Sequence, residues 1–469
     1  MLPKRILHLF LLTLLLALPN FLFGQDVFEI RYIKIEGLKK CKPRVVHRDL
    51  PFKEASVFEQ AELMAALKEG ENRLRNTGLF SSVKVLVDKF DVGNLVDIRV
   101  EIVEAWYPYI IPVFELADRN FNVWFVEYNR DFRRTNYGLH FYHFNATGRG
   151  DRYELLLQQG FTHKYETEYY APFLSAKRSK TGLFVNVLYT NNRDLNFSTA
   201  NNQQLFYRDP EAFLFSRRRF ILGLEHRNSI YLTQGLSLGG YKYIVDDYVE
   251  TDLNPDFLLG RDVQRFLSLE YSVLYDTRDE RPYPMDGVYS KTILRKEGLG
   301  LFRESNNLYI SNDFRYYKQY TERFSISTRT YFKLGLLRNP LNFFQKRILG
   351  YEEQFIRGYE YYVMDGLDAA LVKQDLRFKV FDQTINWGRL VWFEAYKKMP
   401  TEVYVVPFFD MGIANDPWAV QSNDFNRRLL PGYGLGLNLR FYYDKVFRIE
   451  WSRNVLGEAG IFLHWDLRV

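Results

Sequence analysis

Cysteine and histidine are scarce in this chain, with one cysteine and seven histidines in 469 residues. The single cysteine, Cys41, excludes a disulfide within the chain, and its place well beyond the N-terminal segment makes it no obvious lipid-attachment site. His140 and His143 are three residues apart, which puts them on opposite faces of a strand and makes them a poor metal pair. The sequence therefore predicts neither a metal site nor a cofactor.

Long apolar runs are absent beyond the N-terminus, although a membrane-spanning helix needs about 18 or more apolar residues. At the N-terminus itself, Lys4 and Arg5 precede the apolar run Ile6–Leu18, and Gly24 supplies a small residue for cleavage. This is the pattern of a secretory signal peptide, and the run is short for a membrane anchor. We therefore expect residues 1–24 to direct export.

The excess of positive over negative charge is also small, because the net charge is only +6 and no basic stretch occurs. This argues against nucleic acid as a partner. What the chain has in excess is aromatic residues, which make up 17% of it, with 34 tyrosines and 40 phenylalanines. An exported chain that is rich in Tyr and Phe and has no membrane helix is typical of a transmembrane β-barrel with aromatic girdles.

Residues 26–105 have the pattern of a small α+β domain. Alternating apolar residues predict strands, and apolar residues near helical spacing predict helices. The expected order is a strand over Val27–Ile35, helices over Pro43–Leu50 and Phe58–Asn76, and two strands centred on Val85 and Ile98.

Residues 106–469 form a succession of runs that alternate with period 2. Leu267, Leu269, Tyr271 and Val273, for example, alternate with Ser268, Glu270 and Ser272. Alternation alone fits a soluble sandwich equally well, but the export signal, the aromatic excess and the charged second face favour a membrane barrel with a wet lumen.

Counting these runs predicts sixteen antiparallel strands, and single-chain bacterial barrels have an even number. The expected starts lie near Tyr107, Tyr137, Tyr153, Lys164, Thr181, Phe220, Gly235, Phe266, Gly287, Leu308, Phe324, Ala369, Val403, Gly432, Val446 and Gly460. Connections after odd strands include the long ones, and those after even strands are mostly short. The exception is Phe381–Glu402, which is too long for a turn.

Several motifs occur in an order that resembles one family. They are R-L-R-N-T-G-L-F-S-S-V before the barrel, Y-D-T-R-D-E-R-P-Y-P-M-D-G at Tyr275–Gly287, F-I-R-G-Y-E-Y-Y at Phe355–Tyr362, F-F-D-M-G at Phe408–Gly412, and E-A-G-I-F-L-H-W at Glu458–Trp465. Together they resemble the BamA/TamA-type outer-membrane assembly factors, in which POTRA domains precede a barrel. The essential members carry several POTRA domains, whereas this chain has room for one, over residues 26–105, before a barrel over 106–469.

The resemblance implies an outer-membrane protein with its POTRA domain in the periplasm. It implies a factor that inserts client β-barrels, pairing their strands with a lateral seam while the POTRA sheet edge binds them. Its partners would be the lipid bilayer and client polypeptides, and periplasmic or lipoprotein accessory factors stay open. A polypeptide exporter of the two-partner-secretion kind, a loop-gated pore and a purely structural barrel are the alternatives.

The resemblance also assigns roles to the R-G-Y motif. Arg357 would pair with carboxylates of strands twelve and thirteen, at positions that match Asp375 and Asp410. Gly358 would allow close approach to the wall and Tyr359 would serve as an anchor. The alternative is that these charges only line a solvated lumen.

A seam is expected between the first and last strands. Pro108 and Pro112 are four residues apart in strand one, so their missing donors fall on the same edge. That edge would face the last strand, which contains Gly460, Leu463 and Trp465. The alternative is that Pro108 ends the linker and Pro112 marks a bulge.

One enzyme signature is present but lacks its context. Gly235–Gly239 matches G-x-S-x-G, whose serine acts from a strand-to-helix turn in an α/β sheet. Ser237 instead lies in the middle of an expected strand, with leucines on either side. The sequence therefore predicts no enzyme activity.

Overall fold

The computed structural model describes residues 27–466, except 117–122, 128, 175–179, 210, 303–305, 352, 389–396 and 443–444. The expected signal peptide lies outside the described residues. The chain divides into two compact units, residues 1–105 and residues 106–469. Within the described ranges, no helix is both long enough and apolar enough to cross a membrane.

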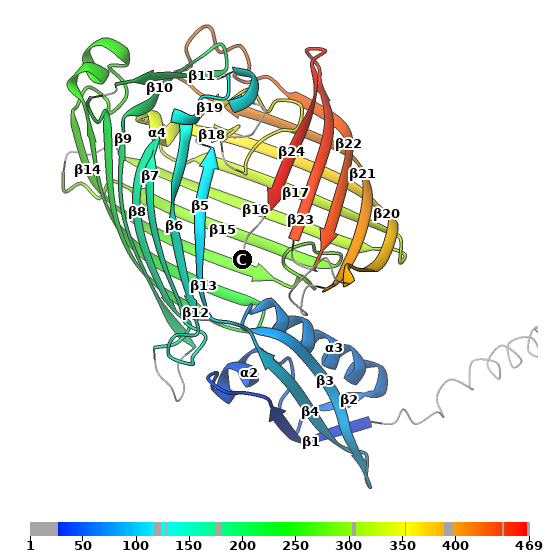
Figure 1. The fold of residues 1–469 in the computed structure, drawn as a ribbon. Coiled ribbons are helices and arrows are strands. Elements are labelled where there is room, and N and C mark those ends of the chain that lie inside the picture. The colour runs from blue at the N-terminus through cyan, green and yellow to red at the C-terminus, as the bar shows by residue number, and fades with distance from the viewer. Residues whose placement is uncertain are drawn as a thin grey trace, which may run out of the picture. The chain divides into compact units, whose positions relative to one another are not determined.

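The first unit is a four-stranded sheet with two helices (Figure 1). Its elements are β1 (Val27–Glu36), α2 (Pro43–Asp49), β2 (Val57–Glu59), α3 (Gln60–Asn76), β3 (Phe80–Asp91) and β4 (Leu95–Glu104). The sheet order is β2-β1-β4-β3, with β1 parallel to β4 and the other pairs antiparallel. The short strand β2 was not expected from the sequence, because three residues are too few to show a period.

The residues that form the core of this unit are those that the strand and helix periodicities of the sequence place on one face. On β4 the residues Val96, Ile98 and Val100 alternate toward the helices and are fully buried. Helix α3 begins with a capping box, in which the side chains of Glu59 and Glu62 each accept a backbone N–H. Its apolar face is buried against the sheet, which orders the whole unit around one layer of branched apolar side chains.

The second unit is a sixteen-stranded antiparallel sheet (Figure 1). Its strands are β5 (Pro108–Leu116), β6 (Thr135–Phe144), β7 (Arg152–Gly160), β8 (Thr162–Ala171), β9 (Thr181–Asn192), β12 (Phe215–Arg227), β13 (Leu232–Val245), β14 (Val263–Asp276), β15 (Gly287–Glu297), β16 (Asn307–Gln319), β17 (Phe324–Gly335), β20 (Asp368–Asn386), β21 (Lys398–Asn415), β22 (Leu430–Phe441), β23 (Lys445–Asn454) and β24 (Ala459–Asp466). The predicted count of sixteen is confirmed, and the predicted starts differ most, by five residues, at β12 and β21.

The connection that seemed too long for a turn is part of a long hairpin. Strands β20 and β21 have 19 and 18 residues and stay paired as far as Asn386 and Lys398. The backbone N–H of Trp387 donates to the carbonyl oxygen of Lys397 at 2.9 Å. The segment therefore extends two predicted strands and, over its described residues, adds none to the count.

The two faces of the sheet differ in polarity as the alternation predicted. On β12 the outward residues Phe220, Leu222 and Leu224 are 50%, 42% and 45% exposed. The inward Arg219 of the same strand forms an ion pair with Glu166 at 2.7 Å. An apolar outer face and a charged lumen match a barrel that sits in lipid.

Short elements cover the end of this unit at which β9 and β17 finish (Figure 1). They are the hairpin of β10 (Asp194–Ala200) and β11 (Gln203–Arg208), and α4 (Phe343–Lys346), β18 (Arg347–Leu349) and β19 (Met364–Asp365) in the loop between β17 and β20. An apolar cluster that includes Phe215, Tyr243, Phe257 and Phe343 packs beneath them. This cluster ties the loops to the wall.

The first unit contains a glycine whose replacement should be unusually costly. Gly37 has φ +88°, and a Cβ there would lie 1.9 Å from the carbonyl oxygen of Ile102. Gly93 has φ +85° with nothing within 4 Å of its Cβ position. In both variants alanine must adopt a left-handed backbone conformation, which lowers the free energy of unfolding by about 1–2 kcal/mol. Only in Gly37→Ala does the new Cβ also clash with the carbonyl oxygen of Ile102, so that β4 must move.

Cys41 is 4% exposed and is the only cysteine, so its labelling rate reports opening of this unit. We expect Gly93→Ala to speed thiol labelling about tenfold, and Gly37→Ala to speed it by roughly a hundredfold or more. Equal rates for the two variants would contradict the predicted clash.

Candidate functional site

The R-G-Y motif lies in the loop between β17 and β20, which folds down inside the second unit. Helix α4 starts this descent with a capping box between Asn342 and Gln345. The fully buried Asn342 also donates from Nδ2 to Oε1 of Gln264. Gln345 donates to Oε2 of Glu297 at 2.8 Å. These bonds attach the start of the loop to β14 and β15.

Arg357 is the centre of a buried charge cluster. Its Nε and Nη2 donate to the two carboxylate oxygens of Asp410 on β21, at 2.8 and 2.6 Å. Its Nη2 also donates to Asp375 on β20 at 2.7 Å, and its backbone N–H donates to Asp410 at 3.0 Å. Arg357 is 5% exposed and Asp410 is fully buried. The fork of one guanidinium thus holds two neighbouring strands.

Two further residues complete the cluster and were not singled out from the sequence. Glu450 on β23 accepts from Nη1 of Arg357 at 3.3 Å. Lys373 on β20 lies 3.6 Å from Asp410 and donates to the carbonyl oxygen of Phe355 at 3.0 Å. The signal was available, because both residues lie on the polar face of an alternating strand. What the sequence lacked was the loop's position relative to β23.

The cluster balances its own charge. With Arg377, which lies 3.8 Å from Asp375, it contains three cations and three carboxylates: Arg357, Lys373, Arg377, Asp375, Asp410 and Glu450. The Arg357 guanidinium also lies 3.8 Å from the centroid of the Phe408 ring. A neutral, hydrogen-bonded cluster avoids the large cost of leaving any single charge buried without a partner.

Glycines allow the loop to lie directly on the wall. Gly358 has φ +94°, and its N–H donates to the carboxylate of Glu360 at 2.8 Å. On the facing strand β22, a Cβ at Gly432 would lie 1.9 Å from the carbonyl oxygen of Arg357. Any side chain at position 432 would therefore displace the motif from its carboxylates.

Tyr359 anchors the other side of the motif. Its side chain is 1% exposed, and its hydroxyl donates to the carbonyl oxygen of Pro431 at 3.2 Å. Its ring meets Phe425 edge-on at 5.8 Å, within an apolar cluster of loop and strand residues. The amphipathic side chain thus combines apolar burial with two hydrogen bonds, since its hydroxyl also accepts from the N–H of Val455 at 3.5 Å.

The loop continues from the motif to the last strand. The ring of Phe355 stacks on His464 of β24 at 5.3 Å, and Tyr361 contacts Phe462 of β24 at 5.7 Å. His464 also lies 3.3 Å from Glu450. The inner face of β24 therefore packs on this loop as well as on β23.

A second segment contacts the same strands at the end of the barrel where β14 finishes. It is the turn 277–286 between β14 and β15, whose Tyr283 accepts a hydrogen bond from Asn438 of β22 at 3.1 Å and packs on Tyr404 of β21. Arg377 donates to the carbonyl oxygen of Pro284 at 2.7 Å, and Glu280 pairs with Arg440. Arg377 thus joins this turn to the Arg357 cluster.

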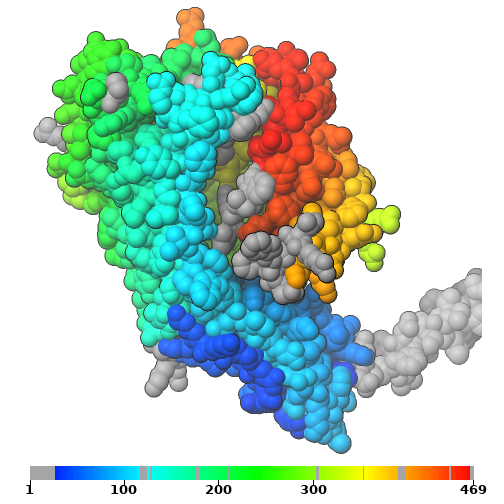
Figure 2. Space-filling model, in the orientation of Figure 1, coloured from blue at the N-terminus to red at the C-terminus, as the bar shows by residue number. Residues whose placement is uncertain are grey.

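The edges of the sixteen-stranded sheet are β5 and β24. Over the described residues no ladder joins them, and Figure 2 shows a hollow in the surface between them. The N–H of Phe144 donates to the carbonyl oxygen of Tyr107, so odd-numbered residues of β5 direct their backbone groups to β6. Pro108 and Pro112 therefore place their missing donors on the opposite edge. On β24, Gly460 pairs with Ser452, Leu463 with Ile449 and Trp465 with Phe447.

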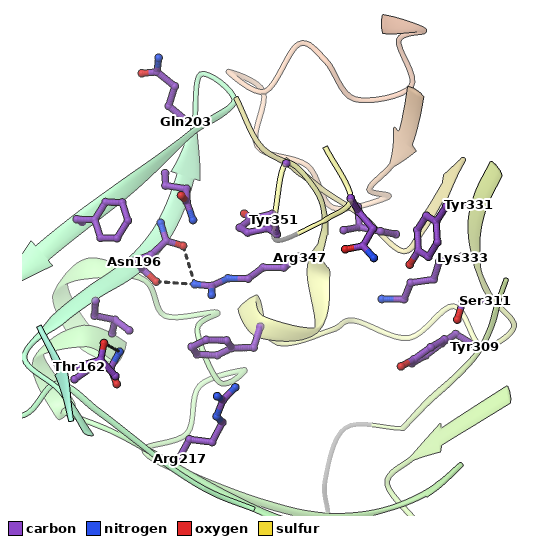
Figure 3. A pocket seen from close by; sticks show the side chains of 18 of the residues that line it. Thr162, Asn196, Gln203, Arg217, Tyr309, Ser311, Tyr331, Lys333, Arg347 and Tyr351 are labelled. Atoms are coloured by element: carbon purple, nitrogen blue, oxygen red, sulfur yellow. Dashed lines mark hydrogen bonds between the residues drawn. The ribbon is translucent and has the colours of Figure 1, made fainter. Parts of the chain in front are cut away.

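A cavity of about 1070 Å³ occupies the lumen beneath the loops. Figure 3 shows Arg347 reaching across it to Asn196 of β10, where Nη2 donates to Oδ1 at 2.8 Å, with Lys333 and Tyr309 on the opposite wall. Above it, Asn202 of the β10–β11 hairpin accepts from the N–H of Val363 and donates to Asp424. Hydrogen bonds thus interlock the three loops that meet at this end of the lumen.

The structure places the G-x-S-x-G serine and His140 on strands, away from this charge cluster. Ser237 lies in mid-β13 between Gly223 and Glu270 on the neighbouring strands, which is no nucleophile elbow. His140 contacts Tyr142 and Glu154. Across the described residues no group of three or more His, Cys, Asp or Glu could hold a metal ion.

Removal of the central arginine should release the loop. In Arg357→Ala, the buried Asp410 and Glu450 lose their main partner, a loss of about 3–5 kcal/mol for a desolvated pair. We expect faster proteolysis within residues 336–367 and loss of heat-modifiable mobility on gels. Arg357→Lys keeps the positive charge but loses the forked guanidinium. Its loop proteolysis should therefore lie between that of the wild type and that of Arg357→Ala.

Arg323→Ala, in an exposed turn, serves as the control for this variant. If loop proteolysis and gel mobility of Arg357→Ala match those of the wild type, Arg357 does not hold the loop against the wall.

The seating of the loop should depend on pH through Glu360, a buried loop residue. Burial raises the pKa of its carboxyl from 4.5 to about 7. Between these values the released loop has lost the proton while the seated loop keeps it, so seating weakens as the pH rises. We expect loop proteolysis to increase between about pH 5 and about pH 8. The increase should vanish in Glu360→Gln and persist in Glu322→Gln, an exposed control.

Comparison with known families agrees with this geometry. Residues 28–105 match the POTRA model, described as a surface antigen variable number repeat, and residues 145–443 match the Omp85 superfamily domain. A search of curated proteins finds no match to the sequence.

Solved structures with the same fold include BamA and CdiB proteins. BamA from Haemophilus ducreyi lacking POTRA domains 1–3 is 13% identical with a TM-score of 0.53, over 93% of this chain and 83% of that one. CdiB from Escherichia coli is 12% identical with a TM-score of 0.57, over 93% and 75%. CdiB from Acinetobacter baumannii is 12% identical with a TM-score of 0.52, over 93% and 74%.

Omp85 proteins reside in the outer membrane with their POTRA domains in the periplasm, and they are non-enzymatic transporters or assembly factors that act on polypeptides. The family match covers more than half of the chain, and the fold agrees with it. This chain therefore belongs to the Omp85 superfamily, as an outer-membrane β-barrel protein with one POTRA domain.

Proposed function

We propose that this protein assembles client β-barrels at the junction of β5 and β24. The observation that carries the proposal is that the sixteen-stranded sheet ends at these two strands without a described ladder between them. Pro108 and Pro112 remove two donors from the β5 edge that faces this junction. An edge with few donors is held weakly, and a client strand can displace the contact that closes it.

The R-G-Y loop supports this proposal by stabilising β24 from inside the lumen. Strand β24 pairs with β23 on one side, and its inner face contacts Phe355 and Tyr361 of the loop. Arg357 in turn binds Asp375, Asp410 and Glu450. In this proposal the wall from β20 to β24 stays rigid while the β5 side moves, so a client strand meets a fixed template.

The POTRA sheet supplies a second pairing surface in this proposal. Strand β3 is an edge of that sheet and has 12 residues, whereas the opposite edge, β2, has three. Addition of a client strand to a sheet edge uses main-chain hydrogen bonds and tolerates many sequences. The long β3 edge is the better site for this.

A polypeptide exporter is the second candidate, favoured by the large polar cavity in the lumen. Export would require the interlocked loops at the outer end to part, including Asn202 and Arg347. Assembly at the seam does not require this. Depletion of the protein separates the two, because loss of several unrelated barrel proteins supports assembly and loss of one secreted protein supports export.

A covalent lock across the seam tests the assembly proposal. In a Cys41→Ala background, one cysteine replaces an outward residue of β5, Ile110 or Phe114, and another replaces the outward Leu463 of β24. Bridging the two with a short bifunctional maleimide should abolish assembly of client barrels. Reduction of a cleavable linker should restore it.

The matched control is a bridge between strands that are already paired. Ile110 and Phe141 are register partners on β5 and β6, so a disulfide there should leave assembly unchanged. Full assembly activity of the protein locked between β5 and β24 would rule out the seam.

A further inference from the structure

We propose that the outer surface of the barrel carries a binding site for the phosphorylated headgroup of a lipid in the outer leaflet. The site consists of Arg218, Lys242 and Arg265, on the adjacent strands β12, β13 and β14. Arg218 is the register partner of Lys242, and Lys242 is the register partner of Arg265. Three cations thus form one row across three strands.

The row lies on the lipid-facing side of the wall. Arg218 shares its face with the exposed Phe220 and Leu222, and Arg265 shares its face with the exposed Leu269. On β13 the even-numbered Leu236 and Leu238 are 51% and 46% exposed and therefore face lipid. Lys242 is also even-numbered, so its side chain points to the same side.

The row also lies at the extracellular end of these strands. Strand β5 follows the periplasmic POTRA domain, so β12 and β14 begin outside and β13 ends outside. Arg218 and Arg265 are close to the first residues of their strands, and Lys242 is close to the last of its own. At the periplasmic end the same face carries neutral groups, such as Gln234 and Tyr271, which bond to each other at 2.9 Å.

These cations have no acidic partner among the described residues. The structure records for Arg218 only a ring contact, with Tyr189 at 5.6 Å, and no ion pair for Lys242 or Arg265. Two inward cations of the same wall do have acidic partners, since Arg219 pairs with Glu166 and Arg295 with Glu270. Like charges directly across a ladder repel each other, so the row is stabilised by an anion from outside the protein.

An apolar groove of about 500 Å³ runs beside the row, which favours a lipid over a free anion. Its floor includes Val187, Phe220 and Leu267, with Phe302 at its side. Gly240 widens it, because a Cβ there would meet only Leu267, at 3.8 Å. A headgroup phosphate at the cations thus places an acyl chain along the groove. Basic clusters at the membrane surface bind anionic headgroups in this way.

The test measures lipid binding to the purified full chain in neutral detergent. The probes are bis-phosphorylated lipid A, the same acylated disaccharide without phosphates, and sodium phosphate, with bound lipid counted by native mass spectrometry. We expect the wild type to bind the phosphorylated lipid, with an affinity that falls as salt rises. Equal binding of the unphosphorylated lipid, or displacement by equimolar phosphate, would overturn the proposal.

The triple variant Arg218→Gln, Lys242→Gln, Arg265→Gln should bind the phosphorylated lipid roughly a hundredfold more weakly, because each cation near an anionic surface contributes about a factor of five. The control variant Lys180→Gln, Arg323→Gln, Lys398→Gln removes the same charge from exposed periplasmic-end positions and should bind normally. Equal binding by both variants would refute the site.

A single substitution separates the groove from the charges. Gly240→Leu should weaken binding of the acylated lipid while leaving binding of the deacylated, phosphorylated disaccharide unchanged. An unchanged affinity for the acylated lipid would show that the groove holds no chain. Heat-modifiable mobility on gels confirms that each variant is folded before it is compared.

Discussion

The structure of the barrel interior depends on one interaction, the buried pairing of Arg357 with Asp410. A fully buried carboxylate is tolerable only with a charged, hydrogen-bonded partner. The main partner, Arg357, lies on a loop rather than on a neighbouring strand, so the loop must lie against the wall for Asp410 to be paired. The glycine at position 432 and the left-handed Gly358 follow from this requirement, since both let the backbone come close enough.

This pairing also distributes rigidity unevenly around the barrel. Strands β20 to β23 are joined twice, by their ladders and by the charges of the loop. Over the described residues, strand β5 pairs in the sheet with β6 alone, and it contains two prolines. The proposed assembly function needs such a contrast, because a uniformly joined barrel would offer no preferred site for a client strand.

Charge is treated differently on the two sides of the wall. Inside, Arg219 of β12 pairs with Glu166 of β8, and Arg357 pairs with three carboxylates. Outside, Arg218, Lys242 and Arg265 stand together with no acidic partner among the described residues, at the level where phosphorylated lipids present their own charge. The protein thus carries one set of charges that it neutralises itself and a second set for which the proposed neutralising group comes from the membrane.

By itself the sequence determined the architecture. Period-2 alternation sets which side chains face lipid, and a barrel has few ways to satisfy sixteen such runs, so strand number and most strand limits could be predicted. The same alternation placed Asp375 and Asp410 on the inner face. The three-residue strand β2 and the paired ends of β20 and β21 could not be predicted, because neither shows enough of a period.

Only the tertiary structure decided how the inner face is used. Glu450 was visible in the sequence as one polar residue among many, and its contact with Arg357 depends on the loop between β17 and β20, which reaches β23 inside the lumen. The row of Arg218, Lys242 and Arg265 is equally invisible, since these residues lie far apart along the chain and meet through strand register. Alternation is a local property of the chain, whereas register and loop path follow from packing and charge pairing between distant segments.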